Sequence, residues 1–351
     1  IETLIKNYAE DDVKIFDPFL GSGTVLFEAG KLGFEAAGTE LNPSAAILSK
    51  VYELINISKA RRNFVLKNLD TFVMNSLSKS IDNEHFVKKL IKYTKNKKSS
   101  SEVKIINALI ILLDGNSNLL NKNEIVKTWN RLQSIIEILP YSTKKIEVFN
   151  RDARKTKLKE NTIDLVITSP PYINVFNYHQ NYRKSVEKLN FDILDIAKSE
   201  IGSNRKNRSN RFLTVVQYGM EMAESLFEIK RISKASSRFI YIVGRESNIR
   251  GTKFYNSDLI LQILEQMNFK IVGIQERSFL NKFGKTIYED ILRFEHKNYN
   301  EKTINNHIEI GREVAIVELE KALKKSDISV KQDLENALIK APTQETSKIF
   351  N

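Results

Sequence analysis

The sequence has 351 residues but no cysteine, only four histidines and no long apolar run. The absence of cysteine excludes a disulfide framework, a thiolate zinc site, an iron–sulfur cluster and a cysteine nucleophile. The histidines show no spacing typical of a metal site, so we expect no bound metal; they are His85, His179, His296 and His307. No apolar run approaches the ~20 residues that span a bilayer, which argues against a membrane protein. We expect a cytoplasmic protein.

Positive charge exceeds negative charge, with 55 Lys and Arg against 43 Asp and Glu, a formal net charge of +12. Such a surplus favours a polyanionic partner, with nucleic acid as the first candidate. A lysine-rich solvated surface explains the charge equally well. Hydrophobic residues at 41% exclude a wholly disordered chain. Because the chain begins with isoleucine rather than methionine, we expect a fragment whose natural start is lost.

Glycine is scarce, yet five of the 13 glycines lie between positions 21 and 38. The pattern there predicts, in order, a strand, a turn, a helix and a second strand, over residues 13–16, 17–24, 25–32 and 34–38. Gly33 ends the helix, as a glycine with positive φ commonly does. Glu40 follows the second strand. This order is the opening of a parallel α/β sheet.

The rest of the chain divides by composition. Residues 51–144 show helical spacing of apolar residues, and between positions 59 and 104 twelve Lys and Arg face four Asp and Glu, so we expect a basic helical insertion. We expect residues 1–50 and 145–296 to form two parts of one α/β core. Residues 297–351 are expected to form a peripheral tail, with a helix over 313–325 and a frayed end.

Within the second part of the core, strands are predicted over residues 145–149, 163–167, 239–243, 270–274 and 287–294. The last two form an antiparallel pair in this prediction. Amphipathic spacing predicts helices over 217–234 and 259–267.

The first loop that carries chemistry is the turn at 17–24. Gly21 and Gly23 have no side chain to keep a ligand away from the backbone. A P-loop is excluded because no Gly-Lys-Ser/Thr follows at the required spacing, and Leu26 stands where a dinucleotide fingerprint needs its third glycine. A carboxylate at Glu40 can accept hydrogen bonds from both ribose hydroxyls. These features favour a nucleoside cofactor without a pyrophosphate; the alternative is an ordinary tight turn.

The second loop follows the predicted strand at 163–167. Two of only six prolines, Pro170 and Pro171, are adjacent there, and they remove two N–H donors. The loop therefore offers carbonyl acceptors beside the planar face of Tyr172, which suits a flat substrate with an exocyclic amine. The alternative is a proline-rich strand exit without a ligand.

Together, Asp17-Pro18-Phe19-Leu20-Gly21-Ser22-Gly23-Thr24 and Thr168-Ser169-Pro170-Pro171-Tyr172 resemble the amino-methyltransferases of DNA. Those enzymes carry a D-P-F-x-G-S-G-T cofactor loop and an S-P-P-Y or D/N-P-P-Y/F catalytic loop. The resemblance covers roughly residues 10–50 and 145–295. It implies a Rossmann-like core with a mainly parallel sheet, S-adenosylmethionine as methyl donor and double-stranded DNA as substrate.

The resemblance also implies which residues hold the cofactor. The first loop would line its methionine end, the acidic residue after the second strand would hold the ribose, and three further residues would lie near the adenine. The implied set is Asp17, Pro18, Phe19, Gly21, Gly23, Thr24, Glu40, Asn42, Pro43 and Asp152.

The implied catalytic residues are Ser169, Pro170, Pro171 and Tyr172. The Ser169 oxygen and the Pro170 carbonyl would accept hydrogen bonds from the amine protons, which stabilises the charge that builds on nitrogen. Tyr172 would stack on a base flipped out of the duplex. In the family, S-P-P-Y is associated more with cytosine N4 and D/N-P-P-Y/F more with adenine N6, so Ser169 favours cytosine. Methylation at cytosine carbon 5 is excluded because it needs a cysteine.

Basic residues after the catalytic loop suit phosphate contacts. The candidates are Arg183, Arg205, Lys206, Arg208 and Arg211. A mobile solvated loop is the alternative there, and the insertion at 51–144 is either a second DNA contact or a structural cap. The family context implies the modification enzyme of a prokaryotic restriction–modification system, associated with the nucleoid and accompanied by a separate restriction endonuclease.

Other functions fit parts of the pattern. An RNA base-amine methyltransferase would share the cofactor loop, but those enzymes more often carry N-P-P-Y-G, and position 173 here is Ile. A non-catalytic DNA-binding relic of the same fold is the second alternative. A nicotinamide-dependent enzyme fits the glycine pattern poorly.

Overall fold

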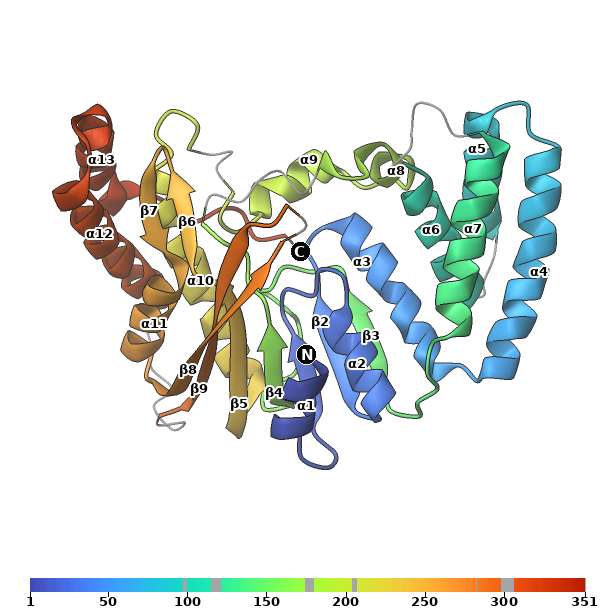
Figure 1. Cartoon of the computed structure of the whole chain (residues 1–351), viewed down its shortest axis with the longest axis horizontal. Helices are drawn as coiled ribbons and strands as arrows, with labels where there is room; N and C mark the ends of the chain where they lie inside the picture. The colour runs from blue at the N-terminus through green and yellow to red at the C-terminus, as the bar shows by residue number, and fades with distance from the viewer. Residues whose placement is uncertain are drawn as a thin grey trace.

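The computed structural model describes residues 1–96, 100–114, 121–173, 180–203, 207–281, 283–297 and 306–350. Its centre is a seven-stranded sheet in the order β3-β2-β1-β4-β5-β9-β8, and a two-stranded sheet of β6 and β7 lies beside it (Figure 1). The strands are β1 (Lys14–Asp17), β2 (Glu35–Thr39), β3 (Ile146–Phe149), β4 (Ile163–Thr168), β5 (Ser233–Gly244), β6 (Glu246–Ile249), β7 (Thr252–Tyr255), β8 (Phe269–Leu280) and β9 (Thr286–His296).

Helices surround the sheet. In the first part of the chain they are α1 (Glu2–Tyr8), α2 (Thr24–Leu32), α3 (Pro43–Ser49), the 3-10 helix η1 (Lys50–Asn56), α4 (Lys59–Ser78), α5 (Asn83–Asn96), α6 (Ser100–Asp114) and α7 (Lys122–Glu137). In the second part they are α8 (Arg183–Lys188), α9 (Ile193–Ile196), η3 (Ala197–Ser199), α10 (Leu213–Ile232), α11 (Asn256–Gln266), α12 (His307–Lys325), α13 (Ile328–Lys340) and η4 (Ala341–Thr343).

The sheet is mainly parallel. β1 pairs in parallel with β2 and β4, β2 with β3, and β4 with β5, whereas β9 is antiparallel to both β5 and β8. This confirms the predicted Rossmann-like α/β class and the antiparallel closing pair. The β6–β7 hairpin is not among the predicted elements.

The strands bury both faces, because side chains alternate along them. Ile15 and Leu165 enter one hydrophobic cluster, while their neighbours Phe16 and Val166 enter the other. The first cluster is completed by helices α1, α2 and α4 to α7, and the second by α10 to α13. Two apolar layers therefore fix the sheet from both sides.

The region between β2 and β3 is helical, as its spacing predicts. Its buried side chains, such as Trp129 and Leu109, belong to the same cluster as Ile15 of the sheet. The guanidinium of Arg62 donates to three carbonyls at the ends of η1 and α7, those of Leu54, Leu139 and Pro140. The insertion and the sheet therefore share one continuous core, and whether the exposed side of the insertion contacts DNA stays a prediction.

Helix α10 is longer and more deeply buried than its predicted amphipathic pattern suggests. Sixteen of its 20 residues are buried, because α12 covers the face that an isolated helix would expose to water. Val314 and Leu319 of α12 are core residues, so the prediction of a merely peripheral helix is wrong. The two helices approach most closely at Gly219 and Gly311, where a Cβ on either residue would collide with the carbonyl of the other.

The first prediction concerns this contact. We expect Gly219→Ala to destabilise the protein by roughly 1–3 kcal/mol, because an added methyl group forces two packed helices apart. The free energy of unfolding in urea measures the effect. The control Glu313→Ala, on the exposed side of α12, is expected to change it by less than about 0.5 kcal/mol. If Gly219→Ala leaves the free energy of unfolding unchanged, the interface adapts to the methyl group.

Candidate active site

The two predicted loops line one cavity of about 340 Å³ at the carboxyl edge of the sheet. This is the place where open α/β sheets bind ligands. Ten of the predicted residues lie on its wall: Pro18, Phe19, Gly21, Glu40, Asn42, Asp152, Ser169, Pro170, Pro171 and Tyr172. The two loops therefore face a common space; we call residues 17–24 the cofactor loop and residues 168–172 the catalytic loop, after the roles that the resemblance implies.

The loops meet because β1 and β4 are neighbouring parallel strands. The hydroxyl of Thr168, at the end of β4, donates to Asp17 Oδ1 at the end of β1 over 2.5 Å. The same oxygen accepts the Phe19 backbone N–H at 3.0 Å. Burial raises the pKa of Asp17 from 3.8 to about 7; these two hydrogen bonds oppose the rise, and the nearby Glu40 carboxylate adds to it. Asp17 thus holds the loop from behind and does not line the cavity itself.

Glycine is required at two points of the cofactor loop. Gly21 and Gly23 both have positive φ, +51° and +80°. A Cβ on Gly23 would lie 2.7 Å from the Tyr52 ring. The Gly21 carbonyl accepts the hydroxyl of Ser49 at 2.9 Å. Gly23 and Thr24 begin α2 and, like Asp17, contribute to the shape of the loop rather than to the cavity wall.

Glu40 is held by the backbone around it. Its Oε2 accepts the Gly21 N–H at 2.7 Å, and its Oε1 accepts the Asn42 N–H at 2.7 Å. Burial raises the pKa of Glu40, and the backbone hydrogen bonds oppose the rise. A carboxylate has about four acceptor positions, and the backbone N–H groups of Asn42, Gly21 and Leu41 act on this one, so it retains capacity for a ligand hydroxyl.

The turn after Glu40 starts α3. The Asn42 side chain accepts the Ser44 N–H at 3.0 Å, and Pro43 occupies the first helical turn, a common start for a helix. Pro43 is buried and does not line the cavity. From the neighbouring strand, the Asn150 amide donates to the carbonyls of Glu40 and Leu41 at 2.7 and 2.9 Å. These bonds fix the turn against β3.

In the catalytic loop, the Ser169 hydroxyl donates to the Ile242 carbonyl at 2.9 Å. Its only proton is thereby used, which leaves the oxygen as an acceptor towards the cavity. The Pro171 carbonyl accepts the hydroxyl of the buried Tyr218 at 3.0 Å. Both bonds tie the loop to its neighbouring elements, β5 and α10.

Tyr172 is held by two glycines. A Cβ on Gly244 would lie 2.7 Å from the Tyr172 ring, and a Cβ on Gly202 would lie 2.5 Å from its carbonyl oxygen. Any larger residue at these positions would displace the aromatic ring or the loop backbone. No local pattern predicts this packing, because the three residues are far apart in the chain.

One wall of the cavity is absent from the sequence prediction. Segment 199–203, which begins at the last residue of η3, contributes four of its five residues, and short stretches after β2 and β3 contribute three more. The additional lining residues are Leu41, Ala45, Ala153, Ser199, Glu200, Ile201 and Ser203. Only Gly202, with φ of +74°, marks this segment in the sequence.

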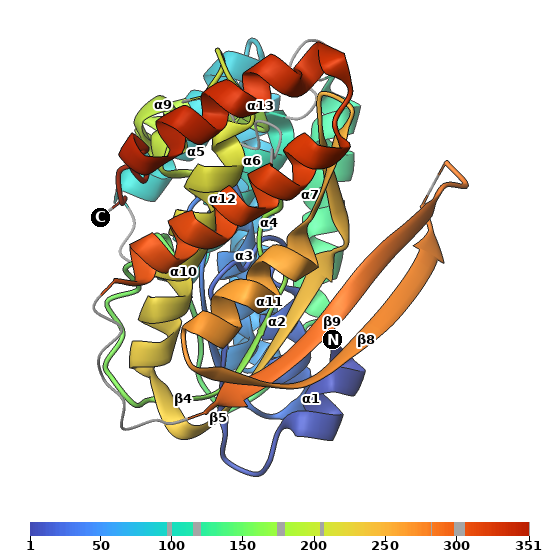
Figure 2. The ribbon, with the colours of Figure 1, turned by 90° about the vertical axis from the view of Figure 1, so that its left-hand side faces the viewer.

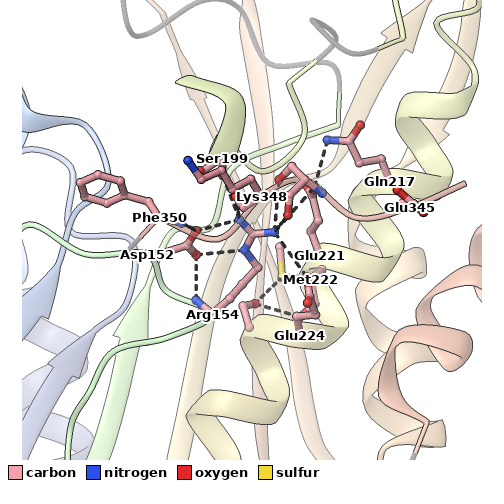
Figure 3. Close-up of polar contacts among 12 residues, drawn as sticks. Asp152, Arg154, Ser199, Gln217, Glu221, Met222, Glu224, Glu345, Lys348 and Phe350 are labelled. Carbon is pink, nitrogen blue, oxygen red and sulfur yellow. Dashed lines mark hydrogen bonds and ion pairs between the residues drawn. The ribbon is translucent and has the colours of Figure 1, made fainter. Parts of the chain in front are cut away.

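Asp152 belongs to a buried polar cluster whose contacts converge on the Arg154 guanidinium (Figure 3). Its Oδ1 accepts the backbone N–H and the Nε of Arg154, both at 3.0 Å, and its Oδ2 accepts Arg154 Nη2 at 2.7 Å and the Phe350 N–H at 3.3 Å. Four donors fill about four acceptor positions. A contact between Asp152 and an adenine amine stays a prediction, and it would replace the longest of these bonds.

Arg154 joins the cavity wall to the tail of the chain. Its Nη2 donates to the carbonyls of Ser199 and Lys348, and its Nη1 donates to the Ser347 carbonyl at 3.1 Å. The Ser347 N–H donates to Glu221 Oε1 at 2.7 Å. The predicted frayed end is therefore wrong for residues 344–350, because the tail supplies buried hydrogen bonds.

Three carboxylates share the Arg154 guanidinium. Burial raises the pKa of Glu224 to about 7 and also raises the pKa of Glu221, while the Arg154 charge lowers both. Burial lowers the pKa of Arg154, but the carboxylates, Asp152 foremost, raise it above its usual value. Arg154 stays charged and is the cation that makes this burial of carboxylates possible.

Of the predicted DNA-contacting residues, the three that the structure describes lie outside the cavity. Arg183 is exposed at the start of α8 and pairs with Glu187 at 2.7 Å. Arg208 and Arg211 are exposed. Arg205 and Lys206 fall outside the described residues, so their prediction stays untested.

Metal-binding clusters and membrane-spanning helices are both absent from the described part of the chain. No group of three or more His, Cys, Asp or Glu side chains there is arranged to hold a metal ion. None of the helices in that part combines the length and apolar character needed to cross a bilayer.

No protein-family model matches the chain. A 131-residue stretch is 27% identical to the Type II methyltransferase M.MjaII of Methanocaldococcus jannaschii, covering 37% of this chain and 23% of that protein. Solved structures similar to the chain include a SAM-dependent methyltransferase from Methanosarcina mazei, at 10% identity and a TM-score of 0.39 over 84% of this chain and 96% of that one. Another is a TehB-like SAM-dependent methyltransferase from Corynebacterium glutamicum. It is 11% identical, with a TM-score of 0.35 over 84% of this chain and 86% of that one.

The raised pKa of Asp17 predicts a pH dependence of stability. Because the folded pKa lies above the unfolded one, the folded state binds more protons, and the stabilisation is lost as pH rises through about 7. Asp17→Asn keeps the acceptor oxygen and removes the titration. From pH 5 to pH 8, we expect the free energy of unfolding of the variant to increase by about 2–3 kcal/mol relative to that of the wild type.

Urea unfolding at the two pH values measures this difference. The control Asp82→Asn, at an exposed carboxylate, is expected to follow the wild type. Parallel pH curves for wild type and Asp17→Asn would contradict the assignment.

Removing Arg154 would leave buried carboxylates without their cation. We expect Arg154→Met to destabilise the protein by about 3–5 kcal/mol, and Asp152→Asn/Arg154→Met to cost less than the sum of the single changes. Denaturant unfolding of all four proteins gives the coupling energy.

The matched control is Arg183→Met, which breaks the surface pair between Arg183 and Glu187. It is expected to cost no more than about 1 kcal/mol. Equal costs for the two arginines would refute a special role for the buried cluster.

Proposed function

We propose that this protein is an S-adenosylmethionine-dependent methyltransferase that modifies the exocyclic amine of a DNA base, with cytosine N4 favoured over adenine N6. The observation that carries the proposal is the meeting of Asp17–Thr24 and Ser169–Tyr172 at one cavity. Each loop has the residue pattern of the DNA amino-methyltransferases, and their joint placement gives the two reactants a common space.

The cavity fits the cofactor in size and in character. Its volume of about 340 Å³ lies within the range of small-molecule pockets, ~300–1,000 Å³. Gly21 presents backbone without a side chain, and Glu40 points a fixed carboxylate at the space. In this proposal Glu40 binds the ribose hydroxyls, Phe19 and Gly21 line the methionine end, and Asn42 lies beside the adenine. When bound, S-adenosylmethionine supplies the methyl group.

The catalytic loop would act on the amine. Because the Ser169 proton is directed to the Ile242 carbonyl, the Ser169 oxygen accepts a hydrogen bond from one amine proton. The Pro170 carbonyl accepts the other. These contacts stabilise the positive charge that develops on nitrogen, and they hold the nitrogen in position for attack.

Tyr172 would hold the target base. Its ring rests on Gly244, and its other face is suited to stack on a planar base. The amine of a paired base is out of reach, so the base must be flipped from the duplex. Two adjacent prolines leave no N–H that competes for the carbonyl acceptors.

Several features support DNA as the substrate. The net charge of +12 suits a polyanion, and Arg183, Arg208 and Arg211 are exposed for phosphate contacts. The partial similarity to a Type II methyltransferase agrees with a role in restriction–modification. In that setting the enzyme protects prokaryotic DNA in the cytoplasm from a separate endonuclease.

The test is transfer of radiolabelled methyl groups to unmethylated duplex DNA, followed by nucleoside analysis. We expect N4-methylcytosine. We expect Ser169→Ala to lower kcat by about 10²–10³ and Tyr172→Ala to abolish measurable turnover, because the base loses its platform. Calorimetry is expected to show unchanged cofactor affinity in both variants.

The control Tyr141→Ala alters an exposed tyrosine away from the cavity and is expected to keep full activity. Full activity of Ser169→Ala and Tyr172→Ala would refute the catalytic assignment. Transfer to structured RNA alone would replace DNA by RNA as substrate, and no detectable cofactor binding would favour the non-catalytic relic.

A further inference from the structure

The hairpin of β8 and β9 extends beyond the end of its neighbouring strand. Gly244, the last residue of β5, pairs with Glu289, but β8 and β9 continue to pair as far as Leu280 and Thr286. Figure 2 shows this two-stranded part standing away from the body of the protein. We call residues 278–281 and 283–288, the described part of this extension, the ribbon.

The ribbon leaves the sheet beside the catalytic loop. Because β9 is antiparallel to β5, it begins at the carboxyl edge, where the cavity lies. Gly244, which pairs with β9 where the ribbon leaves the sheet, is also the residue that contacts the Tyr172 ring. At about 3.3 Å per residue, Thr286 lies roughly 10 Å beyond Glu289. A duplex placed with one base at Tyr172 is within reach of the ribbon.

The surface of the ribbon is apolar and basic. Phe283 is 80% exposed, Leu280 69% and Tyr288 52%. The sequence of residues 278–288 contains two lysines and no acidic residue. Exposed aromatic side chains together with lysines are suited to nucleic acid, since bases stack on rings and phosphates attract the cations.

Hydrogen bonds join the described residues on the two sides of the turn of the ribbon. The Asn281 side chain accepts the backbone N–H groups of Phe283 at 2.9 Å and Lys285 at 3.0 Å. Gly284 has φ of +74°, which other residues rarely adopt. The turn therefore holds Phe283 at the tip before any partner is bound, which lowers the entropic cost of binding.

We propose that the ribbon enters a groove of double-stranded DNA next to the flipped base. A major groove accommodates a two-stranded ribbon, and apolar side chains are used as wedges between bases in bent or opened DNA. Leu280 and Phe283 contact the bases that lose a stacking neighbour when the target base is flipped out. Lys285 contacts a phosphate. This inference rests on the proposed function, because it assumes duplex DNA as the substrate.

The experiment compares two double variants of the full chain. Leu280→Ser/Phe283→Ser changes the ribbon. The matched control, Val272→Ser/Ile274→Ser, changes two exposed apolar residues of the same strand, 58% and 51% exposed, outside the ribbon. Three quantities are measured: affinity for a fluorescent DNA duplex by anisotropy, affinity for S-adenosylmethionine by calorimetry, and molecular mass by analytical ultracentrifugation.

We expect the ribbon variant to bind the duplex about tenfold to a hundredfold more weakly, with the control and the cofactor affinity unchanged. If wild type methylates DNA and the ribbon variant binds the duplex equally well, the ribbon inference is overturned while the proposed function stands. If wild type neither binds nor methylates DNA, the proposed function fails and the ribbon inference fails with it. A ribbon variant that loses only self-association would identify a second copy of the chain as the partner and overturn the DNA contact.

Discussion

The hydrogen bond between Thr168 and Asp17 is the contact on which the site depends. It joins the ends of two neighbouring parallel strands, and each strand continues into one of the two loops. Because side-by-side parallel strands end at one edge, the loops share a cavity although 151 positions separate the two residues. This arrangement buries the Asp17 carboxyl, which raises its pKa and makes its ionised form unfavourable in the folded protein. The helical layers on both faces stabilise the sheet and so offset this unfavourable burial.

A second set of buried charges completes the cavity from the tail. Arg154 connects Asp152, segment 199–203 and residues 344–350, so three distant pieces of chain share one guanidinium. Without the tail, the guanidinium would lose the carbonyls of Ser347 and Lys348. The cavity wall and the tail are held by the same guanidinium, so we expect them to become ordered together.

The parts of the site that the sequence predicts are those with local signals. Gly21 and Gly23 mark a backbone that needs positive φ, and the adjacent Pro170 and Pro171 mark a turn without donors. The 199–203 wall and the docked tail have no such signal, because their partners lie far away in sequence; Ser347 and Glu221 are 126 positions apart. For the same reason α10 looks amphipathic in isolation, whereas α12 covers its outer face. Most of the ribbon lies outside the predicted strands, 270–274 and 287–294, because nothing local tells how far β8 and β9 continue beyond the end of β5.

The distribution of charge links the two proposed ligands. The protein as a whole carries +12, yet the described residues that line the cavity include Glu40, Asp152 and Glu200 and no lysine or arginine. Asp152 is neutralised by Arg154, whereas Glu40 is held by backbone amides and adds to the raised pKa of Asp17. A sulfonium cation in the cavity would offset the repulsion between the Glu40 and Asp17 carboxylates. A cationic cofactor is therefore favoured over a neutral or anionic one. The basic exterior attracts a polyanion but the acidic interior repels its phosphates. A strand of DNA is therefore expected to stay at the mouth and to send in only an uncharged base.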